Sequence, residues 1–144
     1  MTEVVFHLNV PDLESYACRL LRKAYLKGAR VAVQVREPLA TALDQRLWLM
    51  AQGEFVPHAG LSAGDRVVKR SPIVLVATAA EAAHASVLVN LTTDFPEQPG
   101  RFDRVIELVG RSEDDLSQAR VRWKAYRIGG LEPQAHDLAS PGSA

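Results

Sequence analysis

The chain has 144 residues, of which 47% are hydrophobic and 24% charged, close to the averages of soluble globular proteins. This composition excludes a chain that is disordered throughout, and the length suits one domain, which we expect over residues 1–138, followed by a flexible tail over 139–144. Seventeen basic and seventeen acidic side chains give a net charge of zero. That balance argues against a protein that coats nucleic acid through the electrostatic attraction of a net positive charge.

The first elements alternate between strand and helix. Val4 to Leu8 is short, apolar and β-branched, which predicts a buried first strand. Asp12 then stands at the N-cap position of an amphipathic helix, which we expect to end at Gly28. A second strand over residues 29–35 would complete a βαβ unit, whose two strands run parallel.

The middle of the chain predicts a second helix, a long loop and three more strands. The helix opens at Glu37-Pro38 and runs through Trp48, and the glycine-containing stretch 53–69 predicts a loop. The strands are expected at residues 73–76, 87–91 and 102–109. For residues 102–109 a short helix is the alternative, and the β-branched residues Val105, Ile106 and Val109 favour a strand. In the last of these, Glu107 is interpreted as the outward-facing residue of an alternating strand.

A final helix begins at Ser112, where Asp115 three residues later resembles a capping box, and it ends at Ile128 before two glycines. Together these elements predict an α/β fold with three layers, in which a mostly parallel sheet carries helices on both faces. This arrangement is Rossmann-like. The residues after the first strand, however, lack the glycine-rich phosphate-binding loop that such folds use for nucleotides.

Other motifs for catalysis or metal binding are missing from the sequence. It contains neither a Walker A loop nor a G-x-S-x-G elbow, and its four histidines form no i, i+4 pair that would bind a metal. Cys18 is the one cysteine, which excludes an internal disulfide, and its place on the first helix predicts a buried thiol. We therefore expect no catalytic residue, no cofactor and no metal site.

The sequence also gives an expected location. The N-terminus lacks the basic start and apolar run of a signal peptide. The longest apolar run, over residues 73–80, is much shorter than the ~20 residues of a membrane span. We expect a soluble protein of the reducing cytoplasm that does not enter the membrane.

The last helix carries a cluster of cations around one aromatic side chain. Four residues share one face at i, i+3, i+4 and i+7, with Leu116 one turn earlier: Arg120, Trp123, Lys124 and Arg127. This face suits an acidic peptide or a terminal carboxylate, but the pattern is equally that of a solvated basic face whose Trp packs into the core. A different face is expected to pack on the sheet, and its residues are Val121, Ala125 and Ile128.

A second concentration of bulky apolar residues follows the second helix. Trp48 and Phe55 lie where the chain enters the long glycine-containing loop. Aromatic residues are enriched at interface cores, so a protein partner is one interpretation. Closure of the domain core by the same side chains is somewhat favoured by the pattern alone.

Several segments together resemble the chi subunit of bacterial DNA polymerase III. They are the Leu-Trp pair at 47–48, Phe-Val-Pro-His at 55–58, Val-Asn-Leu at 89–91, and the segments 101–107 and 120–130. The likeness extends from about Val4 to Asp137. No single motif is specific, but the Phe-Val-Pro-His element and the end of the last helix are a strong combination.

The resemblance implies a non-catalytic accessory of the clamp loader with a nucleotide-binding-like fold. Its implied partners are the psi subunit, the acidic C-terminal tail of single-stranded DNA-binding protein and, through the psi-binding surface, a helicase. It places tail binding on Arg120, Trp123, Lys124 and Arg127, and psi binding on Trp48 and Phe55. Trp123 stands where a tyrosine is common in the family, a change that keeps an aromatic wall. Leu116 stands where some relatives have a lysine, so the site is expected to be less basic than theirs.

Two alternatives from other classes remain at this point. One is a small α/β enzyme or nucleotide-binding protein with its site near Asn9 and Asp12, at the carboxyl end of the first strand. The other is a direct single-stranded DNA binder that uses the basic and aromatic face of the last helix. The zero net charge and the small size of that face predict poor direct DNA binding.

Overall fold

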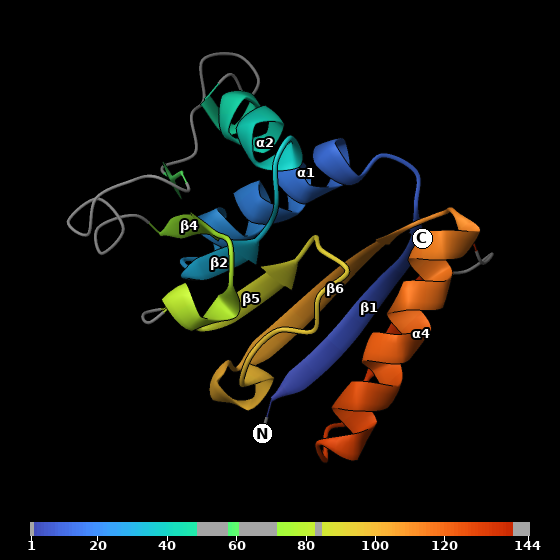
Figure 1. Ribbon diagram of the computed structural model, residues 1–144. Helices are drawn as coiled ribbons and strands as arrows, with labels where there is room; N and C mark the ends of the chain where they lie inside the picture. The colour runs from blue at the N-terminus through green and yellow to red at the C-terminus, as the bar shows by residue number, and fades with distance from the viewer. Residues whose placement is uncertain (1, 49–57, 61–71, 83–84, 140–144) are drawn as a thin grey trace.

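The computed structural model describes residues 2–48, 58–60, 72–82 and 85–139 of the chain (Figure 1). Seven strands form one sheet in the order β3-β4-β2-β5-β6-β1-β7, and every pair of neighbours is parallel. The expected three-layer α/β fold is therefore confirmed, with a sheet that is parallel throughout the described residues. Its strands are β1 (Glu3–Val10), β2 (Val31–Gln34), β3 (His58–Ala59), β4 (Ile73–Val76), β5 (Val87–Asn90), β6 (Arg104–Gly110) and β7 (Gln134–Asp137).

Helices cover both faces of this sheet. On one face lie α1 (Leu13–Leu26) and α2 (Leu39–Trp48), and on the other lies α4 (Glu113–Ile128) (Figure 1). Two short 3-10 helices, η1 (Ala79–Glu81) and η2 (Pro99–Arg101), belong to the connections. The strands β1 and β2 run in the same direction, as the βαβ unit predicts, but β5 and β6 lie between them.

The helix ends follow the sequence signals. The Asp12 side chain caps α1 by accepting from the Ser15 backbone N–H at 3.1 Å. Gly28 follows the last turn with a φ of 81°, which glycine adopts without strain. The Ser112 hydroxyl caps α4 by accepting from the Asp115 N–H at 3.0 Å. Both predicted N-caps are therefore confirmed.

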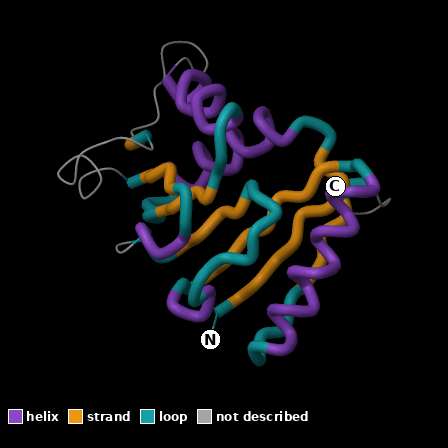
Figure 2. The backbone as a smooth tube through the Cα atoms, viewed as in Figure 1, coloured by secondary structure: helices purple, strands orange, loops and turns teal. Residues whose placement is uncertain are grey.

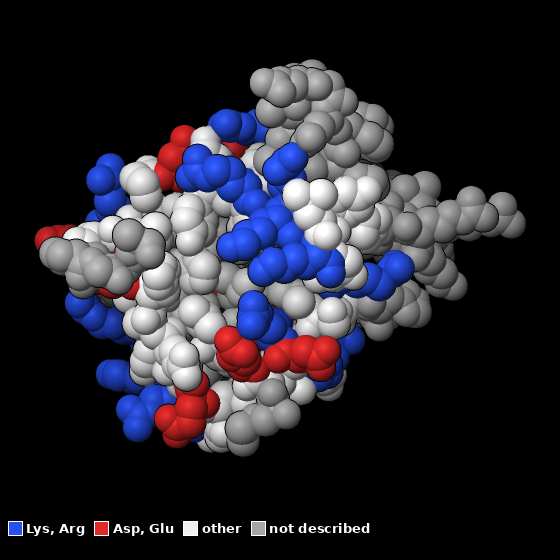
Figure 3. Space-filling view, turned by 180° about the vertical axis from the view of Figure 1, so that it is seen from behind, with Lys and Arg blue, Asp and Glu red and all other residues white. Residues whose placement is uncertain are grey.

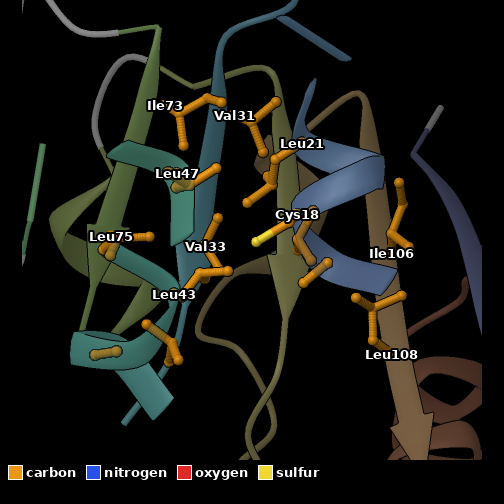
Figure 4. Packing of buried hydrophobic residues seen from close by; sticks show 14 residues of the cluster. Cys18, Leu21, Val31, Val33, Leu43, Leu47, Ile73, Leu75, Ile106 and Leu108 are labelled. Carbon is orange, nitrogen blue, oxygen red and sulfur yellow. The ribbon is translucent and has the colours of Figure 1, made fainter. Parts of the chain in front are cut away.

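The two faces of the sheet have separate apolar cores. Under α1 and α2, residues of both helices pack on alternate residues of the strands, with Cys18 among them (Figure 4). Burial raises the pKa of the Cys18 thiol to about 11, which fits the expected inert, buried thiol. Under α4, the core is built around Phe6 and Tyr126, whose ring centroids lie 5.7 Å apart.

The connection between β5 and β6 crosses the sheet on the side of α4 (Figure 2). Its Phe95 ring lies 4.7 Å from the Tyr126 ring of α4, so this segment and the helix share one core. Two strands are absent from the sequence prediction. The strand β7 follows α4, and β3 is a two-residue strand within the stretch expected to be a loop.

Candidate functional site: the exposed face of α4

The cationic face of α4 borders a cavity of about 280 Å³ between this helix, β1 and β7. Arg120 and Trp123 line it from the helix, together with Leu116. The remaining lining residues are Phe6, Leu8 and Asn9 from β1, Ala119 from α4 and Asp137 from β7. Two of the four predicted tail-binding residues thus line one cavity, beside an apolar wall that the sequence analysis did not identify.

The predicted residues differ in exposure. Arg120, Lys124 and Arg127 are exposed, whereas Trp123 is half-buried. The Trp123 ring packs on Phe6 at a centroid distance of 5.1 Å and an interplanar angle of 51°. Both interpretations of the pattern are therefore partly correct, since one side of the Trp contributes to the core while the residue also lines the cavity.

Asp137 places a negative charge on the β7 side of the cavity. Its Oδ1 accepts from Asn9 Nδ2 at 2.7 Å and from the Ala139 N–H at 2.9 Å. The hydrogen bond from Asn9, followed by that from Ala139, lowers the pKa of Asp137, so the carboxyl is ionised at neutral pH. The two sides of the cavity therefore carry opposite charges, with the Arg120 guanidinium on the α4 side and the Asp137 carboxylate on the β7 side.

A buried ion pair fixes the opposite side of α4. Glu107 of β6 has no exposed surface, and it accepts hydrogen bonds from Arg122 Nε at 2.9 Å and from the Tyr126 hydroxyl at 2.6 Å. Asn90 Nδ2 donates to the same carboxylate at 3.1 Å. The prediction that Glu107 faces outward is wrong, because these three donors take the place of water around its carboxylate.

The face of α4 that packs on the sheet also differs from the prediction. Val121 is 63% and Ile128 is 88% exposed, and Ala125 is only partly buried. The buried stripe consists of Ala119, Arg122 and Tyr126. Pairing with Glu107 allows a charged residue to occupy a position where an apolar one was expected.

The residues named for the nucleotide alternative make internal hydrogen bonds. Asp12 caps α1, and Asn9 donates to Asp137. At the carboxyl ends of β2 and β5, Gln34 Nε2 donates to Asn90 Oδ1 at 3.2 Å and to the Thr92 hydroxyl at 2.9 Å. At these two strand ends, where parallel sheets often bind ligands, the polar side chains hydrogen-bond to one another.

The other predicted sites are only partly covered by the structure. Trp48 is the last residue of α2, but its side chain lies outside the described residues, as does all of Phe55. Within the described ranges, no group of three or more His, Cys, Asp or Glu is placed to hold a metal ion. Among those same residues, no helix is long and apolar enough to cross a membrane.

Sequence comparison gives one consistent family. Residues 1–134 match the family model described as "DNA polymerase III chi subunit, HolC". The chain is 32% identical to DNA polymerase III subunit chi of Pseudomonas aeruginosa over 144 residues, which covers 96% of this chain and 98% of the relative. It is 31% identical to the Escherichia coli protein of the same name over 122 residues, with 83% and 81% covered.

Structure comparison shows the fold alone. The chain superposes on the C-terminal domain of Saccharomyces cerevisiae Dbp5, solved bound to Gle1 and IP6, with a TM-score of 0.63. The match covers 97% of this chain and 92% of that one at 14% identity. A further structure of the C-terminal domain of the DEAD-box protein Dbp5 gives a TM-score of 0.62 at 13% identity, with 96% and 92% covered.

Proposed function

Because the chain belongs to the DNA polymerase III chi subunit family, and is thus a replication accessory protein, we propose that it links the clamp-loader complex to the acidic C-terminal tail of single-stranded DNA-binding protein. It acts as an adaptor without catalysis of its own. The observation that carries this proposal is the cavity beside α4, in which Arg120 and an apolar wall meet. A peptide that ends in an apolar residue and a carboxylate has both complementary features.

The tail would bind in a defined orientation. Its last apolar side chain packs against Trp123 and Leu8, and its terminal carboxylate accepts hydrogen bonds from Arg120 and Lys124. The negative charge of Asp137 disfavours a carboxylate on the β7 side of the cavity. Arg127, one turn beyond Lys124, faces the acidic residues that precede the end of the tail.

This binding is expected to be weak and sensitive to salt. Exposed ion pairs contribute about 0.2–1 kcal/mol each, and added salt screens them. Several tails on one oligomer raise the effective affinity because the second contact becomes intramolecular. The zero net charge of the chain favours this protein partner over direct binding of single-stranded DNA.

The psi subunit, or an equivalent protein, is the second proposed partner, and a helicase can use the same surface. We place this contact on Trp48, the last residue of α2, and on Phe55, which follows seven residues later in the sequence. Since α2 and α4 cover opposite faces of the sheet, the two partners can bind at the same time (Figure 1). Such an adaptor works in the bacterial cytoplasm, at the nucleoid.

The tail site is tested by fluorescence anisotropy with a labelled acidic peptide that ends in Asp-Phe. Arg120→Ala and Lys124→Ala should each weaken binding by about 1.4- to 5-fold. Trp123→Ala should also weaken binding, but with little change in its salt dependence, because this variant removes an apolar contact and no charge. Arg111→Ala is the matched control, because it removes an exposed cation just before α4. Equal effects of all four variants, or no binding by the folded protein at low salt, would contradict the tail site.

The psi contact needs a separate measurement. Trp48→Ala and Phe55→Ala should reduce co-elution with psi while leaving tail-peptide binding unchanged. Circular dichroism of each variant separates a lost contact from a lost fold. Saturable nucleotide binding that is abolished by Asn9→Ala would instead favour the nucleotide-binding alternative.

A further inference from the structure

The face turned away from α4 carries cations that the tail site does not use. Arg19, Lys23 and Lys27 lie four residues apart on and just beyond α1, and all three are exposed. Four residues correspond to about 6 Å along a helix, so these side chains form a row on one side of α1. Figure 3, which shows the molecule from behind, shows Lys and Arg side chains gathered in a band across this face.

An open cavity of about 270 Å³, here called the α1 groove, lies beside this row. It runs between α1 and the amino-terminal ends of the central strands, and Lys23 and Lys27 line it. Most of its other lining is apolar, including Leu20, Ala24, Val31, Val87, Val89 and Ile106. Its volume is slightly below the ~300–1,000 Å³ of pockets for drug-sized ligands, so it suits one or two side chains.

The charges around the groove are unevenly distributed. On the strand side, Arg104 forms an ion pair with Glu3 at 3.5 Å, and both side chains are about half exposed. His7 also lines the groove, and burial lowers its pKa to about 4, so it is neutral at pH 7. The positive potential is therefore concentrated on the α1 side, at Lys23 and Lys27.

We propose that the α1 groove docks an acidic peptide segment of a protein partner, with one apolar side chain in the groove and carboxylates on Lys23 and Lys27. Cations above an apolar lining complement a peptide in which acidic residues flank an apolar one. Single-stranded nucleic acid fits less well, because it binds on aromatic platforms. Among the described residues of the chain, those that line the groove include no Phe, Tyr or Trp. This site lies on the opposite face from the tail site and does not rest on the proposed function.

The site can be located by titrating the ¹⁵N-labelled protein with a peptide amide in which one Phe is flanked by two Asp on each side. The amide lacks the terminal carboxylate that the proposed tail site requires. Amide shift changes are expected over residues 20–31 and at the start of β5 and β6. Changes confined to α4 would overturn the proposal and leave the tail site as the explanation.

Two kinds of variant separate the charge from the groove. Lys23→Glu should weaken binding of this peptide about three- to tenfold at low salt. Arg111→Glu, the same charge change just after the carboxyl-terminal end of β6, should not weaken it. Ala24→Met keeps a good helix former and fills the groove, so it should weaken binding about threefold or more. Unchanged binding by a folded Ala24→Met variant would overturn the groove as the docking position.

A competition experiment decides between the two kinds of anionic ligand. An oligothymidine should displace the peptide from the α1 groove only at concentrations far above the Kd of the peptide. Displacement at equal concentration, with the same shift changes on α1, would overturn the proposal in favour of a single-stranded DNA site. Tail-peptide binding measured on Lys23→Glu should stay unchanged, which keeps this test separate from that of the α4 site.

Discussion

Arg122 of α4 and Glu107 of β6 form an ion pair inside the protein, with Arg122 Nε 2.9 Å from Glu107 Oε1. Their side chains are 5% and 0% exposed. Arg122 also donates to the Thr93 carbonyl oxygen at 3.4 Å, so one guanidinium connects α4, β6 and the connection between β5 and β6. We expect the orientation of α4, and with it the exposure of its cationic face, to depend on this contact.

Arg122→Met should destabilise the protein by about 3–5 kcal/mol, because it leaves the Glu107 carboxylate buried without its cation. Urea unfolding followed by circular dichroism measures this loss. The double variant Arg122→Met/Glu107→Gln should recover part of the stability, since it removes both charges. A loss below about 1 kcal/mol for Arg122→Met would show that the pair does not hold α4.

Tyr126→Phe tests the neutral donor to the same carboxylate. The Tyr126 ring is fully buried and packs on the rings of Phe6 and Phe95, so the variant keeps the aromatic packing and removes only the hydroxyl. A hydrogen bond to a charged group contributes about 1.5–3 kcal/mol, and we expect a loss in that range on chemical denaturation. Thermal unfolding that matches the wild type would contradict a role of this hydroxyl in stabilising the buried carboxylate.

Ser112→Ala removes the N-cap of α4 and should cost about 1 kcal/mol of stability. Ser112→Asp is the matched control, since its carboxylate can accept from the same N–H and interacts favourably with the helix dipole. Differential scanning calorimetry compares the two variants. Equal melting temperatures for Ser112→Ala and Ser112→Asp would contradict the cap.

The fold could be predicted from the sequence because its local signals agree with one another. Apolar runs, caps at Asp12 and Ser112, and the glycine after α1 mark the elements and their order. The hydropathy pattern does not predict that Glu107 and Arg122 are buried. Each charge is compensated by the other, and the two residues are distant in the sequence, so neither position by itself indicates that it has a partner. The strand β7 was missed because it is a polar edge strand, without the apolar alternation that identifies strands.

The candidate site could be predicted only on its helical side. Helical spacing brings Arg120, Trp123 and Lys124 together from the sequence alone. The opposite wall comes from Leu8 and Asp137, which reach the cavity only because β1 and β7 pair beside α4. Such contacts between distant segments depend on strand order, and strand order could not be read from the spacing of residues.

His7 makes the stability of the fold dependent on pH. Its Nδ1 lies 2.5 Å from the Tyr16 hydroxyl, and its ring centroid lies 5.5 Å from that of His136. Burial, followed by the charges of His136 and Arg104, lowers the pKa of His7 from 6.5 to about 4. At His7 the unfolded chain therefore binds more protons than the folded one between pH 4 and 6.5, so the contribution of His7 to the free energy of unfolding falls as the pH drops through this window.

The loss should be on the order of 1 kcal/mol, after allowance for the partial exposure of the ring. Urea unfolding at pH 7 and pH 4.5 measures it, and His7→Gln should reduce the difference, because Gln does not titrate and can still form a hydrogen bond with the Tyr16 hydroxyl. Asp12 and Asp137 have lowered pKa values, so most of the stability that they contribute is lost below the ordinary aspartate pKa of 3.8. Burial raises the pKa of Glu107, which acts in the opposite direction, so the comparison with His7→Gln is what isolates the histidine. An NMR titration in which His7 protonates near pH 6.5 would contradict the argument, since the folded and unfolded states would then bind its proton equally well.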